Sequence, residues 1–71
     1  MKKYMAIIKN IPIGTRVVDD DFTIDFGKEA QKLIGQEIEV IKAEGLDHWF
    51  YYRKGAFDSV IFHRTWLENP K

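Results

Sequence analysis

The segment from His48 to Leu67 constrains the fold more than any other part of the chain. It contains both tryptophans, two of the three tyrosines and three of the five phenylalanines. A glycine near its middle separates two runs rich in aromatic and β-branched residues, a pattern typical of a β-hairpin. Since successive side chains of a strand point to opposite faces, Trp49 and Tyr51 are expected on one face and Phe50 on the other. Part of this aromatic surface must be covered by the rest of the chain or by a partner.

The position of the turn sets the expected register of this hairpin. Counting outward from a turn that begins at Gly55 places Arg53 opposite Asp58, where the two side chains would form an exposed ion pair. The same register places His48 opposite His63 at the far end of the hairpin. The two histidines are therefore predicted to face each other across the strands.

Two short strands are predicted in the first part of the chain. Residues 3–9 form an apolar run too short for an isolated helix, and residues 15–18 are rich in β-formers. Between them, Pro12 removes a ladder donor and Gly14 favours a turn. The three aspartates at 19–21 are predicted to end the second strand, because aspartate is disfavoured in sheets and bonds readily to its own backbone in turns. A loop is expected after them.

A helix is predicted over residues 26–34. Asp25 is the expected N-cap, apolar residues recur at helical spacing, and Gly35 stands where a left-handed residue commonly ends a helix. Residues 36–43 then alternate between apolar and charged, as in a half-exposed strand that leads into the aromatic hairpin. Residues 65–68 have no strand pattern and are expected to form a helical turn or an irregular plug.

Three short motifs in the second half carry a family resemblance. Gly35 precedes a strand, residues 49–52 form an aromatic strand, and residues 61–67 read IFHRTWL. Together they resemble the small SH3-like barrels found in many bacterial and phage-encoded proteins, including those with a KOW-type glycine. The resemblance covers roughly the second half of the chain and implies a small five-stranded barrel.

The predicted fold class is therefore mainly β. The expected architecture is a small SH3-like five-stranded barrel or a curved antiparallel sheet, with one short helix at about residues 26–34. The alternative is an α+β fold in which the helix packs on the sheet. With 71 residues, the chain is expected to form a single domain over residues 1–71. Trp66, after the last predicted strand, is expected to close one end of the barrel.

Composition limits what can stabilise such a domain. The chain has no cysteine, so neither disulfides nor thiolate metal sites supplement a small core. Aromatic residues make up 14% of the chain, and burial of these rings is expected to supply most of the stability. No apolar run has membrane-spanning length, so no membrane association is expected. The absence of cysteine fits a reducing compartment, and the predicted location is the cytoplasm.

The charge pattern argues against simple electrostatic capture of nucleic acid. The formal net charge is zero, whereas that kind of binding requires a basic surface. Residues 1–18 carry only positive charges, while residues 19–47 carry nine acidic residues against three lysines. If this acidic segment lies beside the aromatic surface, it would repel phosphates and favour a basic protein partner.

No enzymatic site is predicted. The chain has no convincing nucleophile set and no glycine-rich phosphate loop, and its aspartate run lacks the spacing of a calcium loop. His48 and His63 together, without a thiol or a carboxylate placed near them by the pattern, make a poor zinc site. Neither a metal site nor a cofactor is expected.

Binding is the preferred functional class, and the predicted partner-binding residues are Trp49, Tyr51, Arg53, His63 and Arg64. Aromatic rings mixed with arginine and histidine are common at protein interfaces and where unpaired bases stack. The main hypothesis is a small non-catalytic protein-interaction module, such as a phage or mobile-element protein that docks on and modulates a host protein. The alternative is a nucleic-acid-binding barrel of the SH3-like or KOW type. A protein partner is preferred over nucleic acid, and the oligomeric state is left open.

Overall fold

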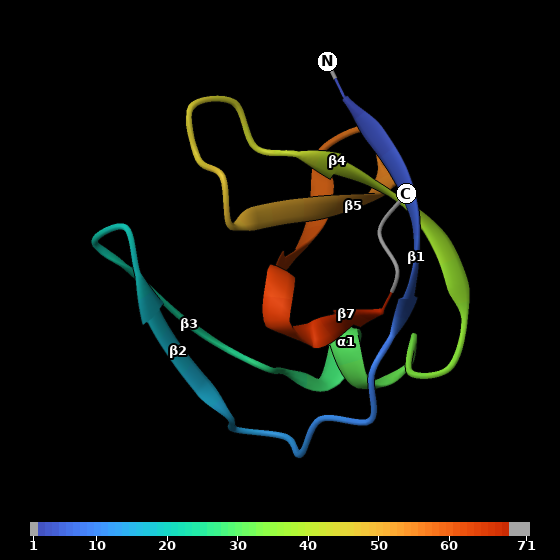
Figure 1. The fold of residues 1–71 in the computed structure, drawn as a ribbon. Coiled ribbons are helices and arrows are strands. Elements are labelled where there is room, and N and C mark those ends of the chain that lie inside the picture. The colour runs from blue at the N-terminus through green and yellow to red at the C-terminus, as the bar shows by residue number, and fades with distance from the viewer. Residues whose placement is uncertain (1, 69–71) are drawn as a thin grey trace.

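The computed structural model describes residues 2–68, and these residues form a mainly β fold (Figure 1). The elements, in chain order, are β1 (Lys3–Ile8), β2 (Arg16–Asp19), β3 (Phe22–Asp25), α1 (Lys28–Gln31), β4 (Glu37–Lys42), β5 (Trp49–Gly55), β6 (Asp58–His63), the 3₁₀ turn η1 (Arg64–Trp66) and β7 (Leu67–Glu68). No helix among these residues is long and apolar enough to cross a membrane.

Five strands form one curled antiparallel sheet in the order β6-β5-β4-β1-β7 (Figure 1). The first and last strands of the chain are neighbours in this sheet, because the short β7 pairs with the end of β1, where Ile8 lies opposite Leu67. β2 and β3 form a separate two-stranded hairpin. The prediction of a curved antiparallel sheet with one short helix is confirmed, and four helical residues are too few for the α+β alternative to describe the fold.

The inner face of the curled sheet holds the main core. Strands with one buried face are expected to alternate between buried and exposed residues, and the first half of β4 does so, with Ile38 and Val40 buried on either side of the exposed Glu39. The next residue, Ile41, is buried as well. The main core cluster consists of Ala6, Ile8, Phe26, Ala30, Ile38, Val40, Phe50, Val60, Phe62, Trp66 and Leu67. Every element of the five-stranded sheet and the helix contributes to it, so the described residues share one core.

The aromatic hairpin forms as β5 and β6, but its predicted register is wrong by one residue. Trp49 lies opposite His63, and Arg53 lies opposite Ser59 instead of Asp58. The pairing shifts between Arg53 and Gly55, which adds one unpaired residue to β5 and moves the turn onto the two residues after Gly55. A bulge of this kind cannot be located by counting outward from the glycine.

The loop predicted after the three aspartates is instead the strand β3, and a tight hairpin turn at residues 20 and 21 precedes it. Asp20 and Asp21 have φ values of 51° and 64°, and Asp19 pairs with Phe22 across them. Positive φ at both central positions is the mark of a type I′ two-residue hairpin turn, and aspartate is one of the few non-glycine residues that tolerate it. The run of aspartates therefore reverses the chain and allows residues 22–25 to form β3.

The helix is also shorter than predicted. It spans residues 28–31, and Gly27 occupies the N-cap position. Asp25 is not the cap, because it ends β3 and its Oδ1 accepts a hydrogen bond from Arg16 Nε at 2.8 Å. After the helix, Gly35 adopts a φ of 80°, as the sequence predicted, and its N–H donates to the Ile8 carbonyl at 2.8 Å.

Trp66 is expected to be among the most costly residues to truncate. Its side chain is 2% exposed, and its ring meets that of Phe26 edge-to-face at a centroid distance of 5.1 Å. Trp66→Ala should lower the free energy of unfolding by about 3–5 kcal/mol, the usual loss for a large buried ring. Chemical denaturation measures this change.

Phe57→Ala is the matched control, because Phe57 lies in the β5–β6 turn and its side chain is fully exposed, at 103%. This variant should stay within about 0.5 kcal/mol of the parent. Equal effects of the two substitutions would show that Trp66 is not part of the core.

Candidate functional site

The hairpin of β2 and β3 packs against the start of the aromatic strand β5. Trp49 is 3% exposed although it lies outside the main core cluster, so its burial depends on this second contact. The Phe22 ring meets the Trp49 ring edge-to-face at 6.4 Å, and Trp49 Nε1–H donates to the Asp19 carbonyl at 3.3 Å. On another side the His63 ring lies 4.8 Å from the Trp49 ring. Trp49 is thus the anchor on which the hairpin rests.

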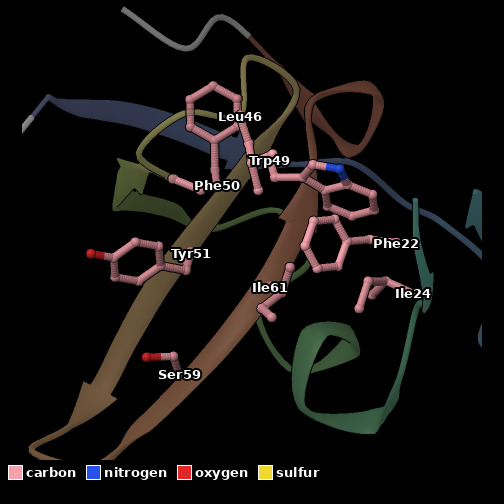
Figure 2. A pocket seen from close by; sticks show the side chains of 9 residues that line it. Phe22, Ile24, Leu46, Trp49, Phe50, Tyr51, Ser59 and Ile61 are labelled. Atoms are coloured by element: carbon pink, nitrogen blue, oxygen red, sulfur yellow. The ribbon is translucent and has the colours of Figure 1, made fainter. Parts of the chain in front are cut away.

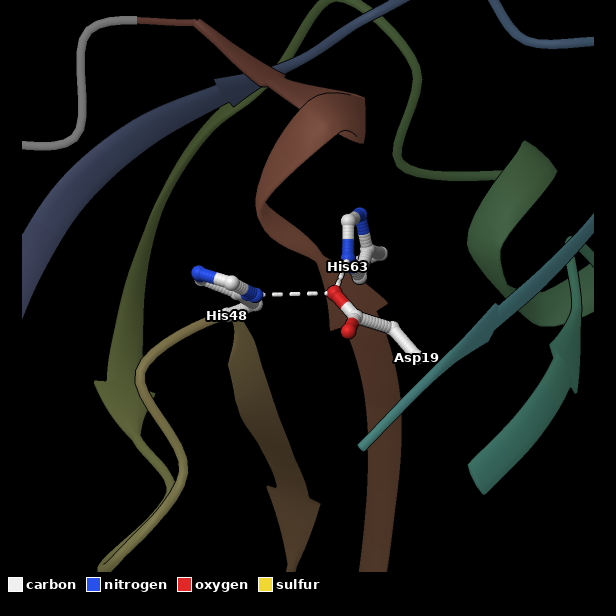
Figure 3. A group of neighbouring side chains, drawn as sticks. All are labelled: Asp19, His48 and His63. Carbon is white, nitrogen blue, oxygen red and sulfur yellow. Dashed lines mark hydrogen bonds and ion pairs between the residues drawn. The ribbon is translucent and has the colours of Figure 1, made fainter. Parts of the chain in front are cut away.

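Asp19, His48 and His63 form a cluster at this contact, here called the Asp19 cluster (Figure 3). One carboxylate oxygen, Asp19 Oδ2, lies 2.8 Å from His48 Nδ1 and 2.8 Å from His63 Nε2. The hydrogen bond with His63, and then that with His48, hold the pKa of the Asp19 carboxyl below its ordinary value. The three residues come from β2, from the turn before β5 and from the end of β6, so the cluster joins three segments.

Thr65 supports the buried histidine of this cluster. Its Oγ1 lies 2.8 Å from His63 Nδ1, and its backbone N–H donates to the same nitrogen at 3.3 Å. Because a backbone N–H can only donate, Nδ1 is the accepting nitrogen of the neutral ring, and Nε2–H donates to Asp19 Oδ2. The position of the His63 ring is therefore fixed on both of its nitrogens.

An apolar groove lies beside this contact, between the β2–β3 hairpin and the β5–β6 strands (Figure 2). Its volume is about 190 Å³, and the surface it exposes is apolar. The groove is lined by Phe22, Ile24, Ala43, Leu46, Trp49, Phe50, Tyr51, Ser59 and Ile61. Phe22 and Ile61 remain 48% and 45% exposed, so large hydrophobic side chains on both walls are open to solvent. The groove is therefore a small apolar depression that opens to solvent between the two strand pairs.

Two unpaired strand edges flank the groove. Within residues 2–68, β6 is the last strand of its sheet and β3 pairs only with β2. The Arg64 N–H donates to the His48 carbonyl, and bonded pairs alternate in antiparallel strands, so the main-chain groups of Ser59 and Ile61 point away from β5. Ile24 of β3 and Ile61 of β6 line both the groove and a neighbouring hollow, so these two edge strands contribute side chains to the same depressions.

The structure brings together only some of the predicted partner-binding residues. Trp49 and the half-buried Tyr51 line the groove, and the buried His63 lies next to Trp49 in the Asp19 cluster. Arg53 and Arg64 are exposed and are not among the groove-lining residues. The prediction that His48 lies directly opposite His63 is wrong, yet their rings still approach to 6.1 Å between centroids.

The residues missed by sequence reasoning belong to the β2–β3 hairpin and to the outer face of β6. The sequence predicts Asp19 only as a turn residue that ends a strand, and it does not mark Phe22, Ile24 or Ile61 as binding residues. The alternation of Phe22, Thr23 and Ile24 after a pair of turn-forming aspartates is a hairpin signal that could have located β3. No comparable signal relates Asp19 to the histidines, because 29 and 44 positions separate them in the sequence.

Comparisons with protein-family models, with curated proteins and with solved structures found no match to this chain. The resemblance to SH3-like and KOW-type barrels therefore stays a prediction.

The Asp19 cluster is expected to hold the hairpin on the sheet. In Asp19→Ala the carboxylate is lost, and the buried His63 ring nitrogen loses its partner. Amide hydrogen exchange over residues 16–25 should then become faster, while exchange in β1 and β4 stays as in the parent. Hydrogen-exchange mass spectrometry or NMR measures both regions at once.

Asp25→Ala is the control within the same hairpin. It removes only the exposed ion pair with Arg16, and exposed pairs contribute little to stability. Equal acceleration in the two variants would contradict a special role for Asp19.

Proposed function

We propose that this protein is a small non-catalytic protein-interaction module that binds an extended, apolar segment of a partner protein in the groove between β3 and β6. The groove combines an apolar lining with side chains from two edge strands, β3 and β6. A bound peptide can use unpaired main-chain groups of an edge strand for affinity and side-chain pockets for specificity. These two features are the components that strand-addition binding requires.

The single observation that favours a protein partner is that the acidic hairpin packs against the aromatic surface. Asp19 contacts both histidines and Trp49, and the turn residues Asp20 and Asp21 are exposed beside it. Carboxylates at this position repel a phosphate backbone. Trp49 is buried under the hairpin, so its face is not presented for stacking with an unpaired base. Nucleic-acid binding remains the second candidate, supported by the basic ends of the chain.

The size of the groove also favours a peptide over a small molecule as the ligand. Pockets for drug-sized ligands usually have volumes of about 300–1,000 Å³. The groove, at about 190 Å³, is smaller than this range and is suited to individual side chains of a longer ligand. Alternate residues of an extended segment point to one face, so every second residue would enter the groove. The exposed carboxylates of Asp20 and Asp21 favour a lysine or arginine beside the apolar positions.

Selection from a random peptide library tests this proposal without knowledge of the natural partner. We expect enriched peptides to carry apolar residues at alternate positions next to a basic residue. N-methylation of the peptide amides that pair with β6 should abolish binding, while methylation of the intervening amides should have little effect. Affinities are measured by calorimetry or fluorescence anisotropy.

Two isoleucines give a matched pair of variants for the same measurement. Ile61 and Ile13 are exposed to similar extents, 45% and 48%, but only Ile61 lines the groove. Ile61→Thr should weaken binding of a selected peptide about tenfold, since it removes apolar contact and keeps a β-forming residue. Ile13→Thr should leave the affinity unchanged.

Binding of nucleic acid is the outcome that would contradict this proposal. Micromolar binding of single-stranded DNA or RNA with a steep salt dependence, together with failure to select any peptide, would replace this proposal with the nucleic-acid alternative. Tyr51→Ala and Arg64→Ala then separate the two surfaces, because Tyr51 lines the groove and Arg64 does not. Of these two variants, only Tyr51→Ala should weaken the binding of a selected peptide.

A further inference from the structure

We propose that the Asp19 cluster is a binding site for a zinc ion. Asp19 Oδ2, His48 Nδ1 and His63 Nε2 all lie within 4.8 Å of one another. Two imidazoles and one carboxylate form a ligand set that zinc accepts in sites with an open position. This inference is independent of the proposed peptide groove, because it depends only on the three side chains.

Small movements of the side chains would complete the zinc geometry. Zinc bonds of about 2.0–2.2 Å place the ligand atoms of a tetrahedral site roughly 3.3 Å apart. Both oxygen–nitrogen distances in the cluster are 2.8 Å, so each must lengthen by about half an ångström in such a site. The two ring nitrogens, which lie within 4.8 Å of each other, must come to the same separation. His48 can supply this movement, because it precedes β5 in a turn and its side chain is 39% exposed.

His63 is the rigid ligand around which the site would be organised. Its side chain is only 6% exposed and packs against the Trp49 ring. The Thr65 N–H donates to His63 Nδ1 in this structure, so the Nε2 proton faces Asp19 Oδ2. A zinc ion would take the place of that proton, and the neutral ring would then carry its proton on Nδ1, where Thr65 Oγ1, at 2.8 Å, can accept it. A partner on the second ring nitrogen is the usual means by which proteins orient a metal-binding histidine.

The surroundings of the site favour a cation that prefers imidazole. Asp19 supplies the only carboxylate in this group of three, and the neighbouring Asp47 is paired instead with Lys42 at 3.1 Å, so two of the three ligand atoms are imidazole nitrogens. Hard cations such as Mg²⁺ and Ca²⁺ prefer a set made of oxygen atoms, whereas imidazole suits zinc. Three protein ligands leave a fourth position for water or for a ligand from another molecule.

A zinc ion at this position would connect the β2–β3 hairpin to the ends of β5 and β6. Its binding free energy would then add to the stability of the state in which the hairpin rests on Trp49. Zinc would thereby fix the wall of the apolar groove that contains Phe22.

Titration of the full-length, tag-free protein with ZnCl₂ and with CoCl₂ tests this inference. The chain contains no cysteine and only two histidines, so a strong signal from nitrogen ligands can be assigned to His48 and His63. We expect one metal ion per chain with a Kd below about 10 μM, and at roughly 100-fold excess over Kd a thermal midpoint raised by about 5 °C or more. Co²⁺ should show the visible absorption of a low-symmetry site, and MgCl₂ should change nothing.

Two conservative variants and one control decide between this site and adventitious binding. Asp19→Asn and His48→Gln should each weaken zinc binding at least about tenfold, because each removes one ligand. Asp21→Asn lies in the same turn, and asparagine tolerates its positive φ, so its zinc affinity should equal that of the parent. His48 is partly exposed, so His48→Gln keeps the test decisive even if substitution of the buried His63 prevents folding.

Absence of saturable Zn²⁺ or Co²⁺ binding up to about 100 μM would overturn the proposal. The same holds if zinc binds equally well to the parent, Asp19→Asn and His48→Gln. Peptide binding measured in the presence of EDTA shows separately whether the groove functions, so failure of one proposal does not imply failure of the other.

Discussion

The contact between the β2–β3 hairpin and Trp49 is the interaction on which the apolar groove and the Asp19 cluster both depend. Trp49 lies outside the main core cluster, so the curled sheet alone would not bury it. Phe22 covers its ring, and the Asp19 carbonyl accepts its indole N–H. A buried tryptophan needs both an apolar neighbour and a hydrogen-bond acceptor, and one short hairpin supplies the two together. The apolar groove and the Asp19 cluster both result from this placement.

The fold therefore has two apolar regions of different character. The main core is continuous and closed, and Phe26, Phe62 and Trp66 are buried within it almost completely. The region around Trp49 is only partly covered, because the hairpin leaves Phe22 and Ile61 exposed at the groove. This open apolar surface is the feature on which the proposed peptide binding depends.

The hairpin also relates the two proposals to each other physically. Asp19 at the end of β2 holds the histidines, while Phe22 and Ile24 of β3 form one wall of the groove. A stronger contact between Asp19 and the two histidines would restrain this wall of the groove. Loss of that contact would allow the wall to move. A shallow groove lined by a two-stranded hairpin is well suited to such control, because an isolated hairpin is only marginally stable by itself.

Local patterns in the sequence determined most of the sheet. The aromatic runs on either side of Gly55 predicted β5 and β6, the alternation before Lys42 predicted β4, and the left-handed Gly35 was identified correctly. The curved, mainly β architecture and the burial of Trp66 followed from these same features. Each of these outcomes depends on periodicity or on the conformation of a single residue, which neighbouring residues reveal.

Tertiary structure decided the strand register, the position of β3 and the Asp19 cluster, because these features depend on contacts between residues far apart in sequence. The bulge between Arg53 and Gly55 changed which residues face each other, and the aspartate turn created β3 where a loop was expected. Asp19 meets His48 and His63 only because the hairpin folds back onto the sheet, and no local pattern encodes that approach. The sequence by itself thus determined the strands and the core they enclose. The packing of one hairpin against Trp49 determined where the groove and the Asp19 cluster lie, since both are made by segments that only the folded chain brings together.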